Sequence, residues 1–259
     1  MVQGIDQKSE VHKSARGDAI NMKTLTSADY QNLTRDARVL SRDEHGDKVL
    51  LLADGRVMKL FRRKRWLSSA LFSPYAVRFA RASAAMRQRG IPSVCVEAIY
   101  RIPASKRHAV VYPLLAGKTL RSVLCDAPGR LDDFMAALAA LLAQLHERGV
   151  YFRAMHFGNV LVCEDDQSLA LLDISETRLF SRPVSPRLRA ASFRALRSYR
   201  EDANLLDTFG PTRFLTMYLQ RTAMKTSDQR AFLNRLGAIL PVFAPKASVA
   251  PDMLPGARA

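Results

Sequence analysis

The sequence predicts an α+β protein, with antiparallel strands in its N-terminal part and mainly helices in its C-terminal part. In the N-terminal part, short apolar runs alternate with turn signals, and Asp54-Gly55 is the strongest hairpin signal. In the C-terminal part, apolar residues recur at helical spacing over longer segments. A chain of 259 residues is long enough for one domain of two lobes or for two small domains, and its 48% hydrophobic residues can build a sizeable core.

The first segment, residues 1–21, has few large apolar side chains and no periodicity, so we expect a disordered N-terminal extension. We expect the structured chain to begin at Met22 and to form a short helix at Asp29–Leu33. Three strands joined by turns are expected next: Arg38–Arg42, Lys48–Leu52 and Val57–Phe61.

A helix is expected at Tyr75–Arg89, because its apolar residues have helical spacing and because Gly90 and Pro92 would end it. Two further strands, Val94–Ile102 and Arg107–Pro113, would complete the small lobe.

The large lobe is expected to begin at Ala116–Leu120, which would open a short helix. Its Gly-Lys-Thr is not a P-loop, because the upstream glycine of that motif is absent. A long helix, Leu131–Arg148, is expected to lead into the loop Tyr151–Gly158. Two short apolar runs, Val160–Cys163 and Leu169–Leu172, then predict a β-hairpin around a polar turn.

The remaining chain is rich in arginine and in helix-forming residues. Three amphipathic helices are expected there: Arg187–Leu206, Pro211–Thr222 and Ser227–Leu240. Pro241–Ala259 has little periodicity and is expected to be a flexible tail.

The region from the end of the long helix through the hairpin carries a recognisable motif. Protein-kinase-like chains carry LHxxGxxHxDxxxxN, then a β-hairpin, then a tripeptide that begins with Asp. Leu145, His146, Gly149 and Asn159 occupy the matching positions without a gap, and Asp173 follows the hairpin. In the order and spacing of these residues, the chain resembles the protein-kinase superfamily.

More narrowly, the chain resembles the bacterial lipopolysaccharide-core (heptose/Kdo) kinase family and the "toluene tolerance" proteins grouped with it, over Met22 to Arg221. The resemblance implies a protein-kinase-like bilobal fold. It would divide the chain into an N-terminal lobe at residues 22–115 and a C-terminal lobe at 116–240, with the tail at 241–259.

The resemblance also implies a site for ATP and Mg²⁺. Lys59, between apolar neighbours on the third strand, matches the lysine that contacts the nucleotide phosphates. Asn159 and Asp173 match the metal ligands, and their oxygens suit a hard cation. The backbone of Tyr112 and Leu114, at the hinge between the lobes, would bind the adenine. The structural alternatives are an outward-facing strand lysine, a loop-capping amide and an ordinary turn aspartate.

Several groups of an active kinase are missing. Phe152 and Ala154 stand where kinases carry the His and the catalytic Asp, and a methyl group cannot accept a proton. A well-placed general base contributes roughly 10²–10⁴-fold in rate. His156 is the candidate substitute, because imidazole titrates near neutral pH; the alternative is a loop histidine that braces the turn. No acidic residue occurs between Asp54 and Glu97, so the helix glutamate is missing, as is the glycine-rich loop.

The net charge of +16 implies an anionic partner: nucleic acid, an anionic membrane surface or a phosphorylated substrate. The basic run Arg62–Arg65, followed by Trp66, is either a solvated charge cluster or a surface for phosphate groups or anionic lipid.

Cys95, Cys125 and Cys163 are widely spaced and are expected to be buried thiols in a reducing cytoplasm. No apolar run approaches the ~20 residues of a membrane span, and we expect no signal peptide.

Two functions stay open. The first is a cytoplasmic ATP-dependent sugar kinase at the inner face of the inner membrane, a monomer that phosphorylates a hydroxyl of lipopolysaccharide core or of another anionic envelope glycolipid. The second is a pseudokinase, a nucleotide-binding or scaffold protein in envelope assembly. Lys59, Asn159 and Asp173 favour the enzyme, whereas the missing Asp, Glu and glycine loop favour the pseudokinase. Nucleic-acid binding would explain the charge but not the motif order, so we set it aside.

Overall fold

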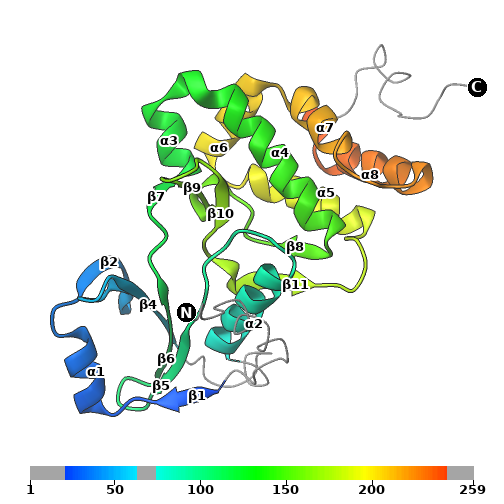
Figure 1. The fold of residues 1–259 in the computed structure, drawn as a ribbon. Helices are drawn as coiled ribbons and strands as arrows, with labels where there is room; N and C mark the ends of the chain where they lie inside the picture. Colours follow the sequence, from blue (N-terminus) through cyan, green and yellow to red (C-terminus); the bar gives the residue numbers. More distant parts are fainter. Residues whose placement is uncertain (1–20, 63–73, 244–259) are drawn as a thin grey trace, which may run out of the picture.

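The computed structural model describes residues 21–62 and 74–243 and shows a sheet-containing lobe beside a helical lobe (Figure 1). The small lobe contains a six-stranded sheet with the strand order β1-β5-β6-β4-β3-β2. Neighbouring strands are antiparallel, except that β1 and β5 are parallel. The strands are β1 (Met22–Thr24), β2 (Arg38–Asp43), β3 (Gly46–Leu51), β4 (Arg56–Arg62), β5 (Ala98–Ile102) and β6 (Arg107–Pro113).

The alternation of side chains along β4 decides which of them face the large lobe. Met58 and Leu60 belong to a cluster that packs under helix α1 (Ser27–Thr34) on one face of the sheet. Val57 belongs to the main cluster, which continues into the large lobe. Lys59 lies two residues after Val57 in the strand and therefore projects from the same face.

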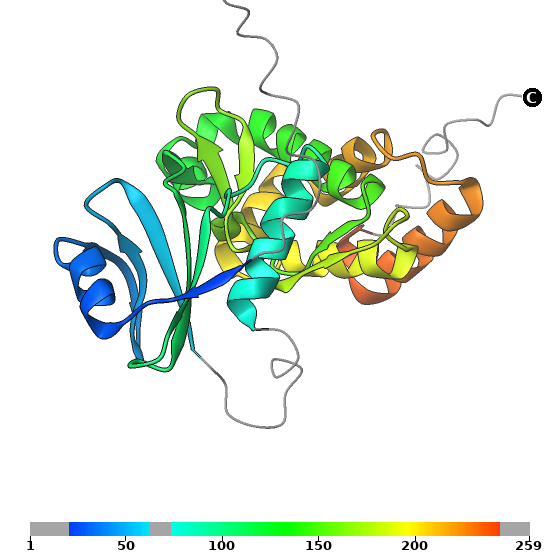
Figure 2. The ribbon, with the colours of Figure 1, turned by 60° about the horizontal axis from the view of Figure 1, so that its bottom comes forward.

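Helix α2 (Tyr75–Gln88) lies between the sheet and the large lobe (Figures 1 and 2). It contacts β4, β5 and β6 on one side and η4 (Ile174–Glu176) and β11 (Thr177–Leu179) on the other. Its buried residues are Ala76, Phe79, Ala80, Ala82, Ser83 and Met86. The helix thus joins the two lobes through one continuous core.

The large lobe is mainly helical. Its helices are α3 (Leu120–Asp126), α4 (Leu131–Glu147), α5 (Pro186–Leu196), α6 (Arg200–Phe209), α7 (Pro211–Leu219) and α8 (Thr226–Ile239). One small sheet has the order β10-β9-β7, and a second pairs β11 with β8. The remaining strands are β7 (Gly117–Thr119), β8 (Val150–Phe152), β9 (Val160–Cys163) and β10 (Leu169–Leu171).

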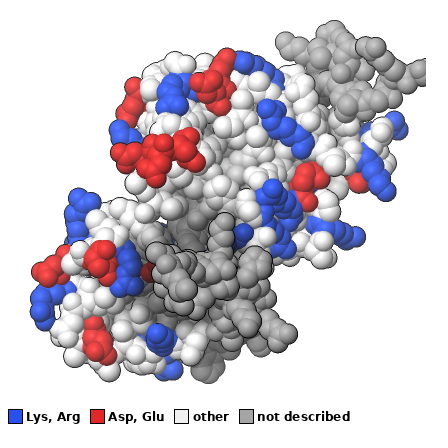
Figure 3. Space-filling model, viewed as in Figure 1, with Lys and Arg blue, Asp and Glu red and all other residues white. Residues whose placement is uncertain are grey.

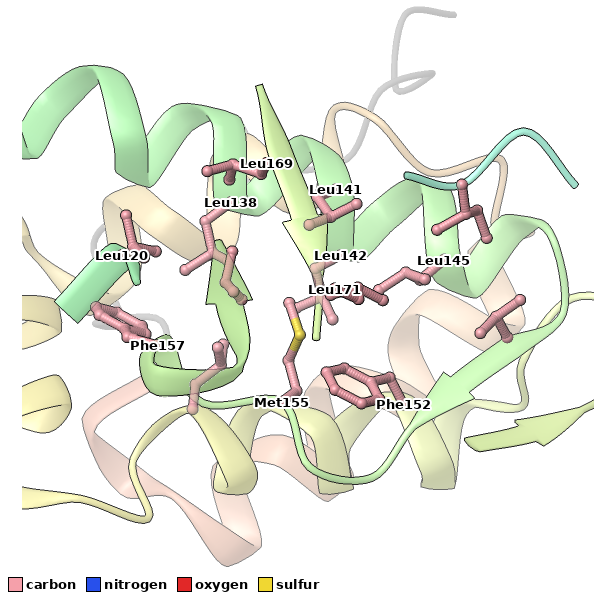
Figure 4. Packing of buried hydrophobic residues seen from close by; sticks show 14 of the residues in the cluster. Leu120, Leu138, Leu141, Leu142, Leu145, Phe152, Met155, Phe157, Leu169 and Leu171 are labelled. Atoms are coloured by element: carbon pink, nitrogen blue, oxygen red, sulfur yellow. The ribbon is translucent and has the colours of Figure 1, made fainter. Parts of the chain in front are cut away.

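Helix α4 forms the centre of this lobe. It buries an apolar stripe at helical spacing against β10 and against the loop that follows β8 (Figure 4). The residues labelled in Figure 4 are Leu120, Leu138, Leu141, Leu142, Leu145, Phe152, Met155, Phe157, Leu169 and Leu171. Because Met155 and Phe157 are buried on either side of His156, the loop is held by its own apolar side chains. Within the described ranges, no helix is long and apolar enough to cross a membrane.

The two-lobed α+β architecture expected from the sequence is confirmed, as is the hairpin of Val160–Cys163 with Leu169–Leu171. The expected helix Arg187–Leu206 is wrong, because the chain forms two helices, α5 and α6. At the break Tyr199 is extended, and the Arg197 guanidinium binds Asp207 of α6. Such a contact between consecutive helices leaves no periodic signal in the sequence.

Four further expectations need correction. Residues 117–119, expected to open a helix, form strand β7, and the helix begins at Leu120. Residues 151 and 152, expected in the loop 151–158, belong to strand β8. The strand expected from Val94 begins only at Ala98. Phe243, expected in the tail, is buried against Phe193. Residues 1–20, most of the basic run with Trp66, and 244–259 lie outside the described residues.

The cysteines also differ from the expectation of buried thiols. Cys95 and Cys125 are exposed, and Cys163 is partly exposed. A cysteine is apolar enough to be placed in a core by composition alone, but these three occupy loop, helix-end and strand-end positions that face outward.

Candidate active site

Lys59 and Asp173, 114 positions apart, meet between the lobes. Lys59 Nζ lies 2.9 Å from Asp173 Oδ2. Lys59 is only 7% exposed, and Asp173 follows β10, so a small-lobe strand and a large-lobe strand each place one partner. The expected juxtaposition of this pair is therefore confirmed, and the reading of Lys59 as an outward-facing lysine is wrong.

Aromatic rings occupy the space around the Lys59 ammonium. Its Nζ lies 5.2 Å from the centre of the Phe79 ring on α2 and 5.7 Å from that of Phe61. Helix α2 thus presents the Phe79 ring to the lysine, on the helix where kinases carry a glutamate, and the ring quadrupole attracts the positive charge. The sequence showed that the acidic residue was missing, but it could not show which side chain replaces it.

Burial and ion pairing act in opposite directions on this pair. Burial lowers the pKa of the Lys59 ammonium, and the attraction of Asp173 offsets only part of that effect. For Asp173, burial raises the pKa, but the charge of Lys59 and hydrogen bonds from Lys59 and Ser175 outweigh it and hold the pKa below its ordinary value. The Ser175 hydroxyl donates to Asp173 Oδ1 over 2.9 Å. Asp173 is therefore a carboxylate at neutral pH.

Asn159 ends the short helix η3 (Phe157–Asn159), just before β9. Its side-chain amide donates to the Ala154 carbonyl over 3.0 Å, and this bond leaves the side-chain oxygen available for other contacts. The described residues contain no group of three or more His, Cys, Asp or Glu that could hold a metal ion by itself. The Asn159 amide oxygen and the Asp173 carboxylate suit Mg²⁺, because that ion needs only one or two protein ligands. Water molecules and the substrate phosphates supply its other ligands.

The hinge comprises the end of β6, which includes Tyr112, and the residues that follow it. Tyr112 is buried, and its ring stacks on Phe79 with the ring centres 5.9 Å apart, so burial raises the pKa of its hydroxyl. Leu114 is 49% exposed and lies between β6 and β7. Adenine binding by the backbone of Tyr112 and Leu114 stays a prediction.

The β2–β3 turn takes the place of a glycine-rich phosphate loop. Asp43 pairs directly with Gly46, so only Glu44 and His45 form the turn. Arg107 of β6 donates to the carbonyls of His45 and Asp47 and ties the turn to the sheet. A short, tied turn with acidic side chains cannot wrap around phosphates as a glycine-rich loop does.

The loop between β8 and β9 carries His156. Its ring packs against Tyr199, with the ring centres 4.7 Å apart. Burial lowers the pKa of this imidazole; the Asp202 and Asp173 charges raise it, and that of Arg121 lowers it. Both roles expected for His156, general base and brace of the turn, stay predictions.

Asp202 is the functional residue that the sequence did not reveal. It is fully buried on α6, where Arg121 Nε and Nη2 donate to its two oxygens over 2.7 and 3.0 Å. The Phe157 N–H also donates to Asp202, over 2.9 Å. Because Phe157 opens η3, Asp202 fixes the backbone between His156 and Asn159. The bonds span 81 and 45 positions, so no local pattern could have indicated them.

A small antiparallel-sheet lobe and a mainly helical lobe, with a lysine–aspartate pair between them, define a protein-kinase-like bilobal fold. The chain is similar to the solved structure of WaaP in complex with acyl carrier protein. The TM-score is 0.50 and the identity 20%, over 78% of this chain and 84% of that chain. This is one of 1525 solved chains that match, so the likeness shows a widespread fold and not an activity. No family model and no curated protein matches the chain.

Proposed function

We propose that the protein is an ATP-dependent, Mg²⁺-dependent kinase that phosphorylates a sugar hydroxyl of lipopolysaccharide core. The observation that carries the proposal is the contact of buried Lys59 with Asp173, beside a loop that presents Asn159. The likeness to WaaP supports the bilobal fold that the motif resemblance implies. Placement within the "toluene tolerance" subgroup is part of the same proposal.

In this proposal Asp173 and Asn159 hold Mg²⁺, and Lys59 contacts the nucleotide phosphates. The bound metal would neutralise phosphate charge. Lys59 would exchange its bond to Asp173 for bonds to phosphate oxygens, which frees the carboxylate for the metal. The hinge backbone at Tyr112 and Leu114 would position the adenine.

The second candidate is a pseudokinase that binds nucleotide without transferring phosphate. One specific observation favours it: the loop offers a methyl group, Ala154, at the position of the catalytic Asp. The tied β2–β3 turn also weakens the case for rapid transfer, because it cannot wrap the phosphates.

The proposed partner is the core of lipopolysaccharide or another anionic envelope glycolipid, met at the inner face of the inner membrane by a monomeric cytoplasmic protein. The net charge of +16 supports an anionic partner. The charge is not spread evenly: acidic side chains gather on the large lobe near α3, while Lys and Arg lie on both lobes (Figure 3). An anionic surface would therefore contact the protein on a side other than that of α3.

The test measures nucleotide binding first. Asp173→Asn should weaken the binding of ATP in Mg²⁺ by about tenfold or more, which corresponds to about 1.4 kcal/mol of binding free energy, because a metal ligand is lost. With EDTA in place of Mg²⁺, the variant and the native chain should bind ATP alike. Asp165→Asn, at an exposed turn in the same lobe, is the matched control and should bind as the native chain does.

A single-turnover reaction with labelled ATP and purified core oligosaccharide then separates the two functions. Labelled oligosaccharide supports the kinase, whereas Mg²⁺-dependent ATP binding without any label transfer supports the pseudokinase. Binding that is unaffected by Asp173→Asn contradicts both.

A further inference from the structure

The pairing of strands β2 and β3 is irregular beside Lys59. The register of the two strands shifts twice, and it skips Leu40 of β2 and Lys48 of β3. Strand β3 pairs with β4 over Val49–Leu51, and the pair nearest the β2–β3 turn joins Val49 to Lys59. Lys48 is therefore the next residue along β3 from the position opposite Lys59. Register shifts of this kind interrupt the alternation of side chains and re-aim them.

The residues on either side of Lys48 point to different faces of the sheet. Val49 packs against the main core cluster and shares the face of Lys59, because residues opposite each other in a sheet lie on the same side. Asp47 lies toward helix α1 on the other face. Burial raises the pKa of the Tyr30 hydroxyl on α1, and the charge of Asp47 acts in the same direction. The alternation is thus interrupted at Lys48, between these two residues.

The Lys48 ammonium belongs to the surroundings of Lys59. Burial lowers the pKa of Lys59, and repulsion by Lys48 lowers it further against the attraction of Asp173. Lys48 is exposed, and it forms no ion pair with a carboxylate of the described chain. Two ammonium groups therefore share the single carboxylate of Asp173, which pairs with Lys59. Because like charges repel, a site that gathers them suits an anion.

The backbone that carries Lys48 is held on both sides. On the turn side, Arg107 of β6 donates to the carbonyls of His45 and Asp47. On the other side, the backbone of Val49 is held by its pairing with β4. The tied turn cannot fold over a chain of phosphates, but it places a long side chain with a positive charge beside the lysine–aspartate pair.

We propose that Lys48 is a second phosphate-binding cation of the nucleotide site, which contacts the phosphate chain of ATP beside Lys59 where kinases use a glycine-rich loop. This role rests on the nucleotide site proposed above, and it applies to a kinase and to a pseudokinase alike. A glycine-rich loop offers backbone N–H donors to the phosphates, whereas an ammonium offers donors and a charge through its side chain.

Calorimetric titration of the full chain with ATP in Mg²⁺ tests the contact. Lys48→Gln should weaken ATP binding by about tenfold, because a charge-assisted bond to phosphate is lost. Adenosine, which has no phosphate, should bind to the variant and to the native chain alike. Lys48→Arg keeps the charge and should retain most of the affinity for ATP.

Lys23→Gln is the matched control. It removes the same charge from an exposed position on β1, at the opposite edge of the same sheet. Its affinity for ATP should stay within about twofold of the native value, since a remote exposed charge is screened by salt. An equal loss of ATP affinity in Lys23→Gln and Lys48→Gln overturns the contact, because net charge alone would then explain the loss.

Thermal unfolding separates a role in binding from a role in folding. Because Lys48 and Lys59 repel each other, Lys48→Gln should leave the melting temperature unchanged or raise it. Weaker ATP binding together with a melting temperature that falls by several degrees overturns the proposed role, since Lys48 would then support the fold.

Two outcomes distinguish the role of Lys48 from the nucleotide site itself. ATP binding that is weakened by Asp173→Asn but not by Lys48→Gln leaves the nucleotide site in place and overturns the role of Lys48. If the native chain binds no ATP in Mg²⁺, the proposed function fails, and inorganic tripolyphosphate replaces ATP as the probe. Its binding should then be weakened by Lys48→Gln and not by Lys23→Gln, whereas equal binding by the three chains, or none, overturns the role of Lys48.

Discussion

At the scale of single residues, Asp202 organises the loop that carries His156 and Asn159. It is fully buried, and among the described residues Arg121 and the Phe157 N–H donate the bonds that compensate the cost of burying its charge. Asp202→Asn should therefore lower the free energy of unfolding by about 3 kcal/mol, because a buried ion pair loses one partner. Urea unfolding followed by circular dichroism measures this difference.

The chain offers a matched control for that substitution. Arg197 and Asp207 also form a two-bond ion pair, but the Asp207 side chain is 44% exposed. Asp207→Asn should cost less than about 1 kcal/mol, since solvent already screens the pair. Equal losses for the two substitutions would show that burial of Asp202 does not determine its contribution.

At the scale of elements, strand β7 determines how the hinge enters the large lobe. Gly117 pairs with Cys163 of β9 and has φ of 147°, a backbone conformation that side chains disfavour. A Cβ there would lie 2.1 Å from the Val162 carbonyl oxygen, so the close approach of β7 to β9 requires glycine. Gly117→Ala should lower the free energy of unfolding by about 3 kcal/mol.

Thermal unfolding of Gly117→Ala can be compared with that of Gly129→Ala. A Cβ at Gly129 has nothing within 4 Å, and its φ is not in the left-handed region. Alanine at 129 should leave stability unchanged or raise it by up to about 1 kcal/mol, because the unfolded chain loses freedom. A Gly117→Ala protein as stable as Gly129→Ala would contradict the close approach.

At the scale of the whole molecule, acid should weaken the large lobe through His146. This residue is fully enclosed: its ring bonds the Tyr218 hydroxyl and Ser192, and Arg189, which is paired with Glu147, lies nearby. Burial, followed by repulsion from Arg189, lowers the pKa of His146 well below its ordinary value. Below about pH 6.5, His146 is therefore protonated in the unfolded chain but stays neutral in the folded chain. The free energy of unfolding consequently falls as the pH falls.

Between pH 7 and pH 5 this group alone should cost about 2 kcal/mol of unfolding free energy, while above about pH 6.5 it should contribute no pH dependence. His146→Asn is expected to be less stable at pH 7 but to lose about 2 kcal/mol less than the native chain over that interval. Urea midpoints at several pH values measure both. Parallel pH profiles would show that the folded His146 accepts a proton as readily as the unfolded one.

The sequence by itself determined the features that depend on neighbours along the chain. The Asp54-Gly55 turn signal predicted the β3–β4 hairpin, helical spacing predicted α4, and the spacing of Leu145, Asn159 and Asp173 indicated the fold. These signals are local, because a strand or a helix repeats its pattern every few residues. The missing acidic residue on α2 and the methyl at Ala154 could also be read directly.

Only the tertiary structure decided which distant groups meet. Contacts between separate elements place the Phe79 ring beside Lys59 and accompany the break between α5 and α6. They also bring Asp202 to the Arg121 guanidinium and the Phe157 N–H. The packing of the His156 ring against Tyr199 likewise joins two separate parts of the chain. Such contacts follow from how elements pack, and packing leaves no periodic trace in the order of residues. The environment of His156 is therefore a property of the folded protein and not of its motif.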